Sequence, residues 1–190
     1  MAGVRVGLKN LHYALLTKDD ATGATYGAPK KIIGAITANI SPSTNTETLY
    51  SDDGPSDVAS ALGEITVELN VKDLPLDIQA ELLGHTLGSD GVLLKNANDQ
   101  APYVAIGFES LKSNGKKRFV WLYKGKFQPA EEEYQTKEDS PTFQTPTIEG
   151  TFVKREFDGN WQAVGDEDAT GFTEATAAAW FTSVYEKSAA

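Results

Sequence analysis

The chain has 190 residues, with 17 Lys and Arg against 27 Asp and Glu, so its net charge is −10. This length is typical of one domain that can bury a sizeable core. The acidic balance argues against binding to nucleic-acid phosphates or anionic lipid. The absence of Cys excludes disulfides, zinc ribbons and thiol nucleophiles, and two His cannot form a multi-His metal site within one chain.

Most of the chain has the residue pattern of β-strands. Strands are predicted at residues 11–17, 31–40, 64–72, 102–110, 117–127 and 147–157. Period-two alternation in the 64–72 strand predicts that its apolar residues face the core, namely Ile65, Val67, Leu69 and Val71. In the 117–127 strand the same argument assigns one face to Phe119, Trp121, Tyr123 and Phe127. Asp158-Gly159 predicts a hairpin turn after the last strand.

Two segments are predicted to be helical. The first begins after Asp73 as N-cap, and Gly84 is expected to end it in a left-handed conformation. Its apolar residues recur every four positions, as Leu74, Ile78 and Leu82, and are expected to pack on the core. The second covers residues 173–187, with Thr173 as cap. His85, after the first helix, is expected to be exposed or to bond terminal carbonyls rather than to act in catalysis.

A stretch rich in Ser, Thr, Asn, Asp, Gly and Pro at residues 41–60 predicts a long projecting loop. We therefore expect one domain over residues 1–190, with this loop and a C-terminal segment at about 165–190. Long strands with one central and one terminal helix predict a mainly β fold, a β-sandwich or barrel of two packed antiparallel sheets with a flanking α-helix and a short C-terminal helix.

The sequence carries no recognisable catalytic or metal-binding motif. It has no phosphate-binding glycine loop, no dinucleotide fingerprint and no nucleophile elbow. The run from Asp166 to Gly171 resembles the start of a calcium loop, but the twelfth position is Ala177, where a bidentate Glu is required. A turn that precedes the last helix explains these residues better. We expect no enzyme activity, no metal and no cofactor.

Several blocks resemble, in order and spacing, the major tail tube proteins of long, flexible-tailed bacteriophages (siphoviruses) of Gram-positive bacteria. The blocks are TETLYSDDGPSDVASALGEITVELNVKDLPLDIQAELLGH (46–85), APYVAIGFES (101–110), KRFVWLYKGKF (117–127), YQTKEDSPTFQTPTIEGTF (134–152) and the pattern DGNW…DATGF…WF…VY (158–185). The resemblance covers nearly the whole chain.

This resemblance implies a structural virion protein without enzyme activity or cofactor. It implies hexameric rings stacked into a hollow tube, with the chain itself, a tape measure protein, and tail terminator and distal tail proteins as partners. DNA would pass through the lumen without specific binding, and the protein would reside in the phage tail after assembly in the host cytoplasm, with no membrane contact.

Two sets of residues are candidates for the tube's surfaces. Contacts between subunits or rings are expected in the 41–60 loop, at Thr46, Glu47, Thr48, Leu49, Tyr50, Ser51, Asp52 and Asp53. The polar face of the 64–72 strand is a candidate for the lumen wall, through Glu64, Thr66, Glu68 and Asn70. The sequence fixes the face but not its direction, so this face could also form the tube exterior or a subunit seam.

Three other readings stay open. The chain could be another ring-forming component on the same fold, such as a tail terminator or a type VI-like tube protein. It could be a carbohydrate-binding β-sandwich, through Trp121, Tyr123 and Trp161, although alternation favours the core for these aromatics. It could be a hydrolase that uses Glu64 and Glu68.

Overall fold

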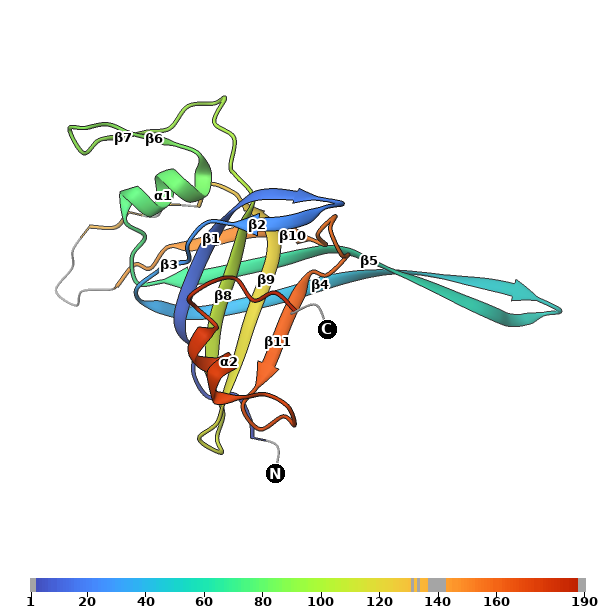
Figure 1. Cartoon of the computed structure of the whole chain (residues 1–190). Coiled ribbons are helices and arrows are strands. Elements are labelled where there is room, and N and C mark those ends of the chain that lie inside the picture. Colours follow the sequence, from blue (N-terminus) through green and yellow to red (C-terminus); the bar gives the residue numbers. More distant parts are fainter. Residues whose placement is uncertain (1–2, 131, 133, 137–142, 188–190) are drawn as a thin grey trace.

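The computed structural model describes residues 3–130, 132, 134–136 and 143–187. The predicted fold class is confirmed: the chain is mainly antiparallel β with two short helices (Figure 1). The elements in chain order are β1 (Lys9–Asp20), β2 (Gly23–Tyr26), β3 (Lys30–Lys31), β4 (Ala35–Ser51), β5 (Gly54–Val71), α1 (Leu76–Leu83), β6 (Thr86–Leu87), β7 (Leu93–Leu94), β8 (Val104–Leu111), β9 (Lys117–Phe127), β10 (Thr147–Val153), β11 (Gln162–Asp166) and α2 (Glu174–Ala179).

Hydrogen bonding is continuous through the large sheet, in the order β2-β1-β8-β9-β10-β5-β4, with β11 on β9 and β3 on β1. Its two halves nevertheless pack on each other, because one buried cluster draws side chains from both. β1, β8 and β9 contribute residues such as Leu11, Ile106 and Leu122, while β5 and β10 contribute residues such as Val67 and Phe152. Strands β6 and β7 form a separate small hairpin beside α1.

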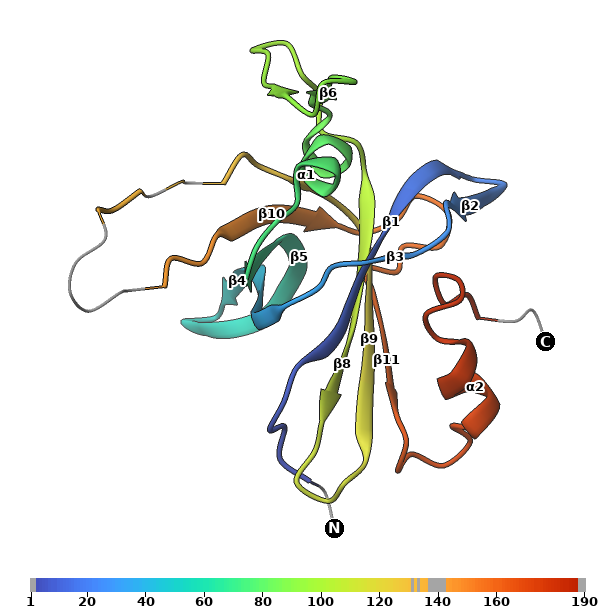
Figure 2. The ribbon, with the colours of Figure 1, turned by 90° about the vertical axis from the view of Figure 1, so that its left-hand side faces the viewer.

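The pair β8–β9 is buried on both of its faces (Figure 2). Alternate residues such as Ile106 and Leu122 enter the cluster shared with β5 and β10. The residues between them, such as Phe119 and Trp121, enter a second cluster that the C-terminal segment covers. The Trp121 ring lies against Gly107, where an added Cβ would lie 2.6 Å from the ring. Glycine is therefore required at this position.

The β5 prediction is confirmed: Ile65, Val67, Leu69 and Val71 are all buried. The prediction for β9 is only partly right. Phe119, Trp121 and Tyr123 share one cluster, but Phe127 lies in the other. The register with β8 shifts between Leu122 and Gly125, and the extra residue reverses the alternation beyond it.

Helix α1 begins later than predicted. Pro75 is its N-cap residue, and Asp73 instead accepts a bond from the Leu74 amide at 2.9 Å. Pro fits the start of a helix because its fixed φ suits the first turn and its missing N–H is not needed there. The predicted end is correct, since Gly84 has φ 73°. Of the three expected core residues, Leu74 and Leu82 are buried and Ile78 packs against the core while partly exposed.

The C-terminal helix is shorter than the predicted 173–187. Thr173 does cap it, accepting a bond from the Thr176 amide at 3.2 Å, but α2 ends at Ala179. The apolar side chains beyond this point still pack on β8–β9, because Trp180 and Val184 are buried there. Burial against the sheet thus continues after the helix geometry ends, and residues 188–190 lie outside the described part.

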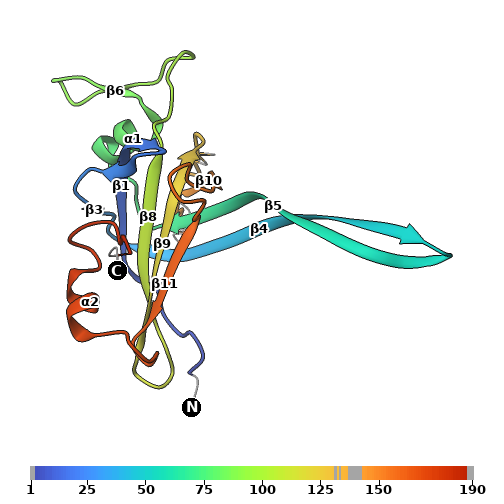
Figure 3. The same cartoon turned by 45° about the vertical axis from the view of Figure 1, so that its right-hand side comes forward.

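The segment 41–60 projects as predicted, but its assignment as a loop is wrong, because all of it except the turn at Asp52-Asp53 belongs to the two long strands β4 and β5. They form a twisted hairpin that projects from the body (Figures 1 and 3). Composition misled the prediction: the segment is rich in Ser, Asn and Asp, but its alternating Thr residues, such as Thr46 and Thr48, suit a strand.

The predicted hairpin at Asp158-Gly159 is also wrong. The turn exists, with Gly159 at φ 72°, but β10 and β11 do not pair with each other. Instead both pair with the same edge of β9, β10 with Lys124–Phe127 and β11 with Arg118–Leu122. Residues 154–161 therefore form a connecting segment between two strands that follow one another along the same edge of β9.

Leu82→Ala tests the contact between α1 and the core. Leu82 has no exposed surface, so the substitution should lower the free energy of unfolding by about 2–5 kcal/mol. Leu76→Ala on the same helix is the control, because Leu76 is 45% exposed and should cost much less. Denaturant unfolding measures both, and equal losses would contradict the placement of Leu82 in the core.

Candidate assembly surfaces

The projecting part of the β4–β5 hairpin, Thr44–Leu62, is called the arm below. Strand β10 pairs with β5 only as far as Ile65, so the arm extends beyond the body as a two-stranded ribbon. No side chain of the arm is buried. The eight candidate contact residues, Thr46, Glu47, Thr48, Leu49, Tyr50, Ser51, Asp52 and Asp53, all lie in its outer part.

The tip of the arm is a tight turn at Asp52-Asp53, with φ of 49° and 62°. Both residues are in the left-handed region, which costs energy for residues other than Gly but which Asp and Asn tolerate best. Two consecutive positive φ values define the turn that matches the twist of a β-ribbon. The tip is therefore a defined hairpin turn rather than a flexible end.

The candidate lumen residues lie together on the polar face of β5. Glu64 and Glu68 are exposed, while Thr66 and Asn70 are partly exposed. Asn70 Nδ2 donates to Thr147 Oγ1 of β10 at 2.9 Å, so it also joins two strands. Glu149 of β10, which was not predicted as part of this face, stands directly opposite Glu68 in the β5–β10 register.

Two like charges in directly opposed positions destabilise a sheet. Glu68 accepts a bond from Asn39 Nδ2 at 3.3 Å, which relieves little of this repulsion. Alternation within β10 could have placed Glu149 on an exposed face, but only the register shows that it faces Glu68. The opposed pair of Glu68 and Glu149 thus adds negative charge to this face without stabilising the monomer.

The residues 154–161 surround a buried guanidinium. Arg155 lies over the Tyr123 ring, 3.8 Å from its centroid, and pairs with both Asp158 and Glu186. Burial disfavours the charge of Arg155, but the hydrogen bonds that its guanidinium donates to these two carboxylates outweigh this effect and raise its pKa. Because Glu186 is near the C-terminus, this cluster fastens the end of the chain to β9. No short motif in the sequence indicated it.

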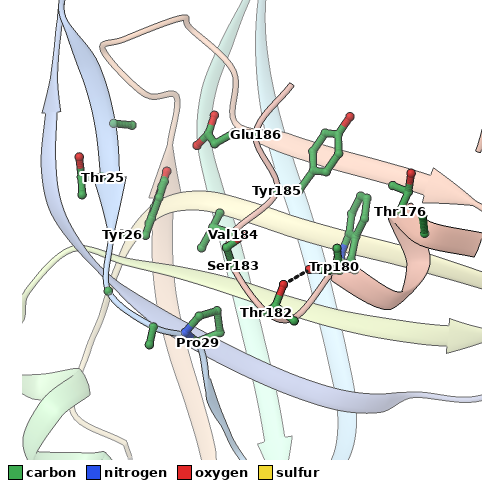
Figure 4. A pocket seen from close by; sticks show the side chains of 15 residues that line it. Thr25, Tyr26, Pro29, Thr176, Trp180, Thr182, Ser183, Val184, Tyr185 and Glu186 are labelled. Carbon is green, nitrogen blue, oxygen red and sulfur yellow. Dashed lines mark hydrogen bonds between the residues drawn. The ribbon is translucent and has the colours of Figure 1, made fainter. Parts of the chain in front are cut away.

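Beside this cluster lies a groove of about 640 Å³ between residues 24–29 and the C-terminal residues 175–186 (Figure 4). Tyr26, Pro29 and Trp180 contribute to its walls, and Glu186 is the one acidic residue among its lining. That carboxylate pairs with Arg155, and the other polar side chains of the lining are hydroxyls of Ser, Thr and Tyr, with no His, Lys or Arg among them.

His85 was expected to be exposed or to bond carbonyls, and this was wrong. Its side chain is only 6% exposed, and Nδ1 lies 2.7 Å from Asp99 Oδ2. The Asn96 amide and then His85 lower the pKa of Asp99. The pair ties the two ends of the segment that carries β6 and β7, which is a structural role.

The acidic turn before α2 is held by cations of the chain itself. Asp166 accepts bonds from Arg118 Nε and Nη2, each at 2.6 Å, and lies 3.0 Å from Lys112 Nζ. Lys112 also pairs with Asp168. The carboxylates that resembled the start of a calcium loop are thus used within the fold.

Metal binding, membrane insertion and carbohydrate binding were each compared with the described residues. They contain no group of three or more His, Asp or Glu placed to hold a metal ion. Within them, no helix is long and apolar enough to cross a membrane. Trp121 and Tyr123 are buried, and Trp161 packs against the core cluster while partly exposed, so the three do not form the exposed aromatic platform that a carbohydrate site requires.

The Asp166 cluster predicts a pH dependence of stability. Its bonds to Arg118, followed by those to Lys112, lower the pKa of Asp166 from 3.8 to about 2. The stabilisation is therefore complete above the unfolded pKa and is lost as the pH falls from about 4 towards 2. Asp166→Asn should lower the free energy of unfolding at pH 7 by on the order of 2 kcal/mol.

Denaturant unfolding across this pH range checks the prediction, because the gap between variant and wild type should close as the pH falls. Asp57→Asn in the arm is the control, since it removes an exposed carboxylate outside the cluster. A gap that stays constant down to pH 2 would contradict the role of the Asp166 charge.

Comparison with known proteins adds one finding. A family model described as phage tail tube protein matches residues 8–190, which includes the arm, β8–β9 and the C-terminal segment. A search of the curated proteins gave no match. Proteins of the matched family are structural components of the virion tail and self-assemble into its tube. Since the match covers almost the entire chain, the chain belongs to the phage tail tube protein family.

Proposed function

We propose that this chain forms hexameric rings that stack into the hollow tail tube of a siphovirus of Gram-positive bacteria, and that DNA passes through this tube into the host. The observation that carries the proposal furthest is the arm, which extends a long ribbon with no buried side chain beyond the body (Figure 3). A two-stranded ribbon is marginally stable by itself in water. Contact with neighbouring copies would supply the packing that the arm lacks.

The partners follow from this role. The tube would assemble in the host cytoplasm around a tape measure protein and would be joined to tail terminator and distal tail proteins. The proposed role requires contacts between subunits and no catalytic site. The carboxylates before α2 are consistent with it because they are used in ion pairs within the fold. Electron microscopy of the concentrated, purified protein tests the role: tubes support it, while single rings favour a terminator or another ring component on the same fold.

Removing the arm should block assembly without unfolding the body. Asn45 and Ala61 are opposed in the register, so replacing Thr46–Ser60 with Asn-Gly closes a shorter hairpin. Because the arm has no buried side chain, the melting temperature should stay close to that of the wild type. Electron microscopy should then show no tubes.

The control for this deletion replaces only Asp52-Asp53 with Asn-Gly, which keeps the full arm and favours the same turn. It should assemble like the wild type. Normal tubes from the shortened protein would contradict the proposed role of the arm.

We further propose that the polar face of β5 and β10 lines the lumen. Glu64, Glu68 and Glu149 would then present carboxylates to the DNA, whose phosphates they repel. Basic side chains here would gain affinity through counterion release and would hold the DNA on the wall. The Debye length is about 8 Å at physiological salt, so only DNA close to the wall is repelled strongly.

Replacing Glu64 and Glu68 together with Lys tests this proposal. Assembly should persist, DNA passage should slow, and isolated tubes should gain DNA affinity that falls with added salt. The double Gln variant is the control, because it removes the negative charge without adding a positive one. If neither the Lys variant nor the Gln variant assembles, the two residues belong to a seam between subunits and not to the lumen.

A further inference from the structure

The two faces of the arm differ in chemistry. Directly opposed residues of an antiparallel ladder share a face, and alternate residues along each strand point to opposite sides. Thr48 pairs with Val58, and Glu47 pairs with Ala59, so these two pairs lie on opposite faces. The first face is called the neutral face and consists of Thr44, Thr46, Thr48, Tyr50, Pro55, Val58, Ser60 and Leu62.

The second face, the acidic face, carries both Glu47 and Asp57, with Asn45, Leu49, Ala59 and Ala61 around them. The whole span from Ala35 to Val71 contains six acidic residues and no Lys or Arg. No cation of the arm itself can therefore neutralise the acidic face. The neutral face, in contrast, contains only hydroxyl and apolar side chains.

The neutral face continues the side of the sheet that covers the core. In the body, Ala38 and Ile40 of β4 pack against the buried cluster, and Thr44 follows at the same parity beyond Pro42. Past this point no layer of the described chain covers the face, so Val58 is 59% exposed and Tyr50 is 70% exposed. The neutral face of the arm thus continues the core-facing side of the sheet, but no second layer packs on it.

The acidic face continues the polar side that holds Glu64 and Glu68. Burying carboxylates without paired cations is costly, and every copy carries a net charge of −10. Burying β-branched and aromatic surface is favourable. A neighbouring copy that covers the neutral face therefore gains free energy from apolar burial, whereas covering the acidic face requires the burial of carboxylates.

We propose that the neutral face of the arm is the surface that packs against a second copy of this chain, while the acidic face stays toward solvent. This inference rests on the proposed function and specifies how the arm makes its contact. It predicts that two adjacent residues on one strand, Val58 and Ala59, behave differently in assembly.

Val58→Lys and Ala59→Lys form a matched pair. Each adds the same charged side chain to an exposed site on β5. Lys at 59 would stand opposite Glu47, where its charge is favourable, and Lys at 58 would stand opposite Thr48. We expect Val58→Lys to abolish tubes in sedimentation and electron microscopy and Ala59→Lys to keep them. Val58→Thr, which is uncharged and β-branched, should restore assembly.

A second measurement avoids disrupting the interface. Because the chain has no Cys, Val58→Cys and Ala59→Cys each introduce a unique thiol. Maleimide labelling at 58 should slow by an order of magnitude or more on assembly, whereas labelling at 59 should change little. Equal protection at both positions, or protection at 59 alone, would overturn the assignment of faces.

Assembly of the wild-type protein distinguishes failure of the proposed function from failure of this inference. If the wild-type protein forms no rings or tubes, the proposed function and this inference both fail. If the wild type and Val58→Lys assemble equally well, the proposed function stands and the neutral face is not the contact surface.

Discussion

The rest of the structure depends on one strand being enclosed on all sides. β9 bonds to β8 along one edge and to β10 and β11 along the other, and its two faces lie in different clusters. Between Phe119 and Gly125, each residue of β9 therefore has to fit both a neighbouring strand and a packed face. The close approach of Gly107 to Trp121 and the bulge before Gly125 are two results of this constraint.

The same strand connects parts of the chain with different tasks. One cluster joins β9 to β5, from which the arm extends, and the other joins it to the C-terminal segment. Arg155 adds a third link, since it stacks on Tyr123 of β9 and pairs with Glu186. These links hold together the body from which the arm extends, whereas the arm itself has no buried side chain.

Several local features were predicted correctly, although the start of α1 and the end of α2 were not. The alternation of Ile65 and Val67, the left-handed Gly84 and the Thr173 cap depend on neighbours in the chain, and all were predicted. The fold class followed from the same signals.

What the sequence analysis missed depends on register or on distant partners. Nothing near Phe127 shows that a bulge reverses its face, and nothing near Glu149 shows that Glu68 stands opposite. The arm was read as a loop because its composition is polar, yet a ribbon outside the core has no need of apolar alternation. The candidate residues Thr46–Asp53 were located by resemblance, and their separation into two faces required the observed pairing.

The direction of the β5–β10 ladder has a mechanical consequence. Its hydrogen bonds run perpendicular to the strands, and the arm continues along β5. A pull on the tip therefore loads the ladder in shear, so that its six registered residue pairs resist together rather than opening one after another. A force along the arm therefore acts on this joint in the direction in which its ladder is strongest.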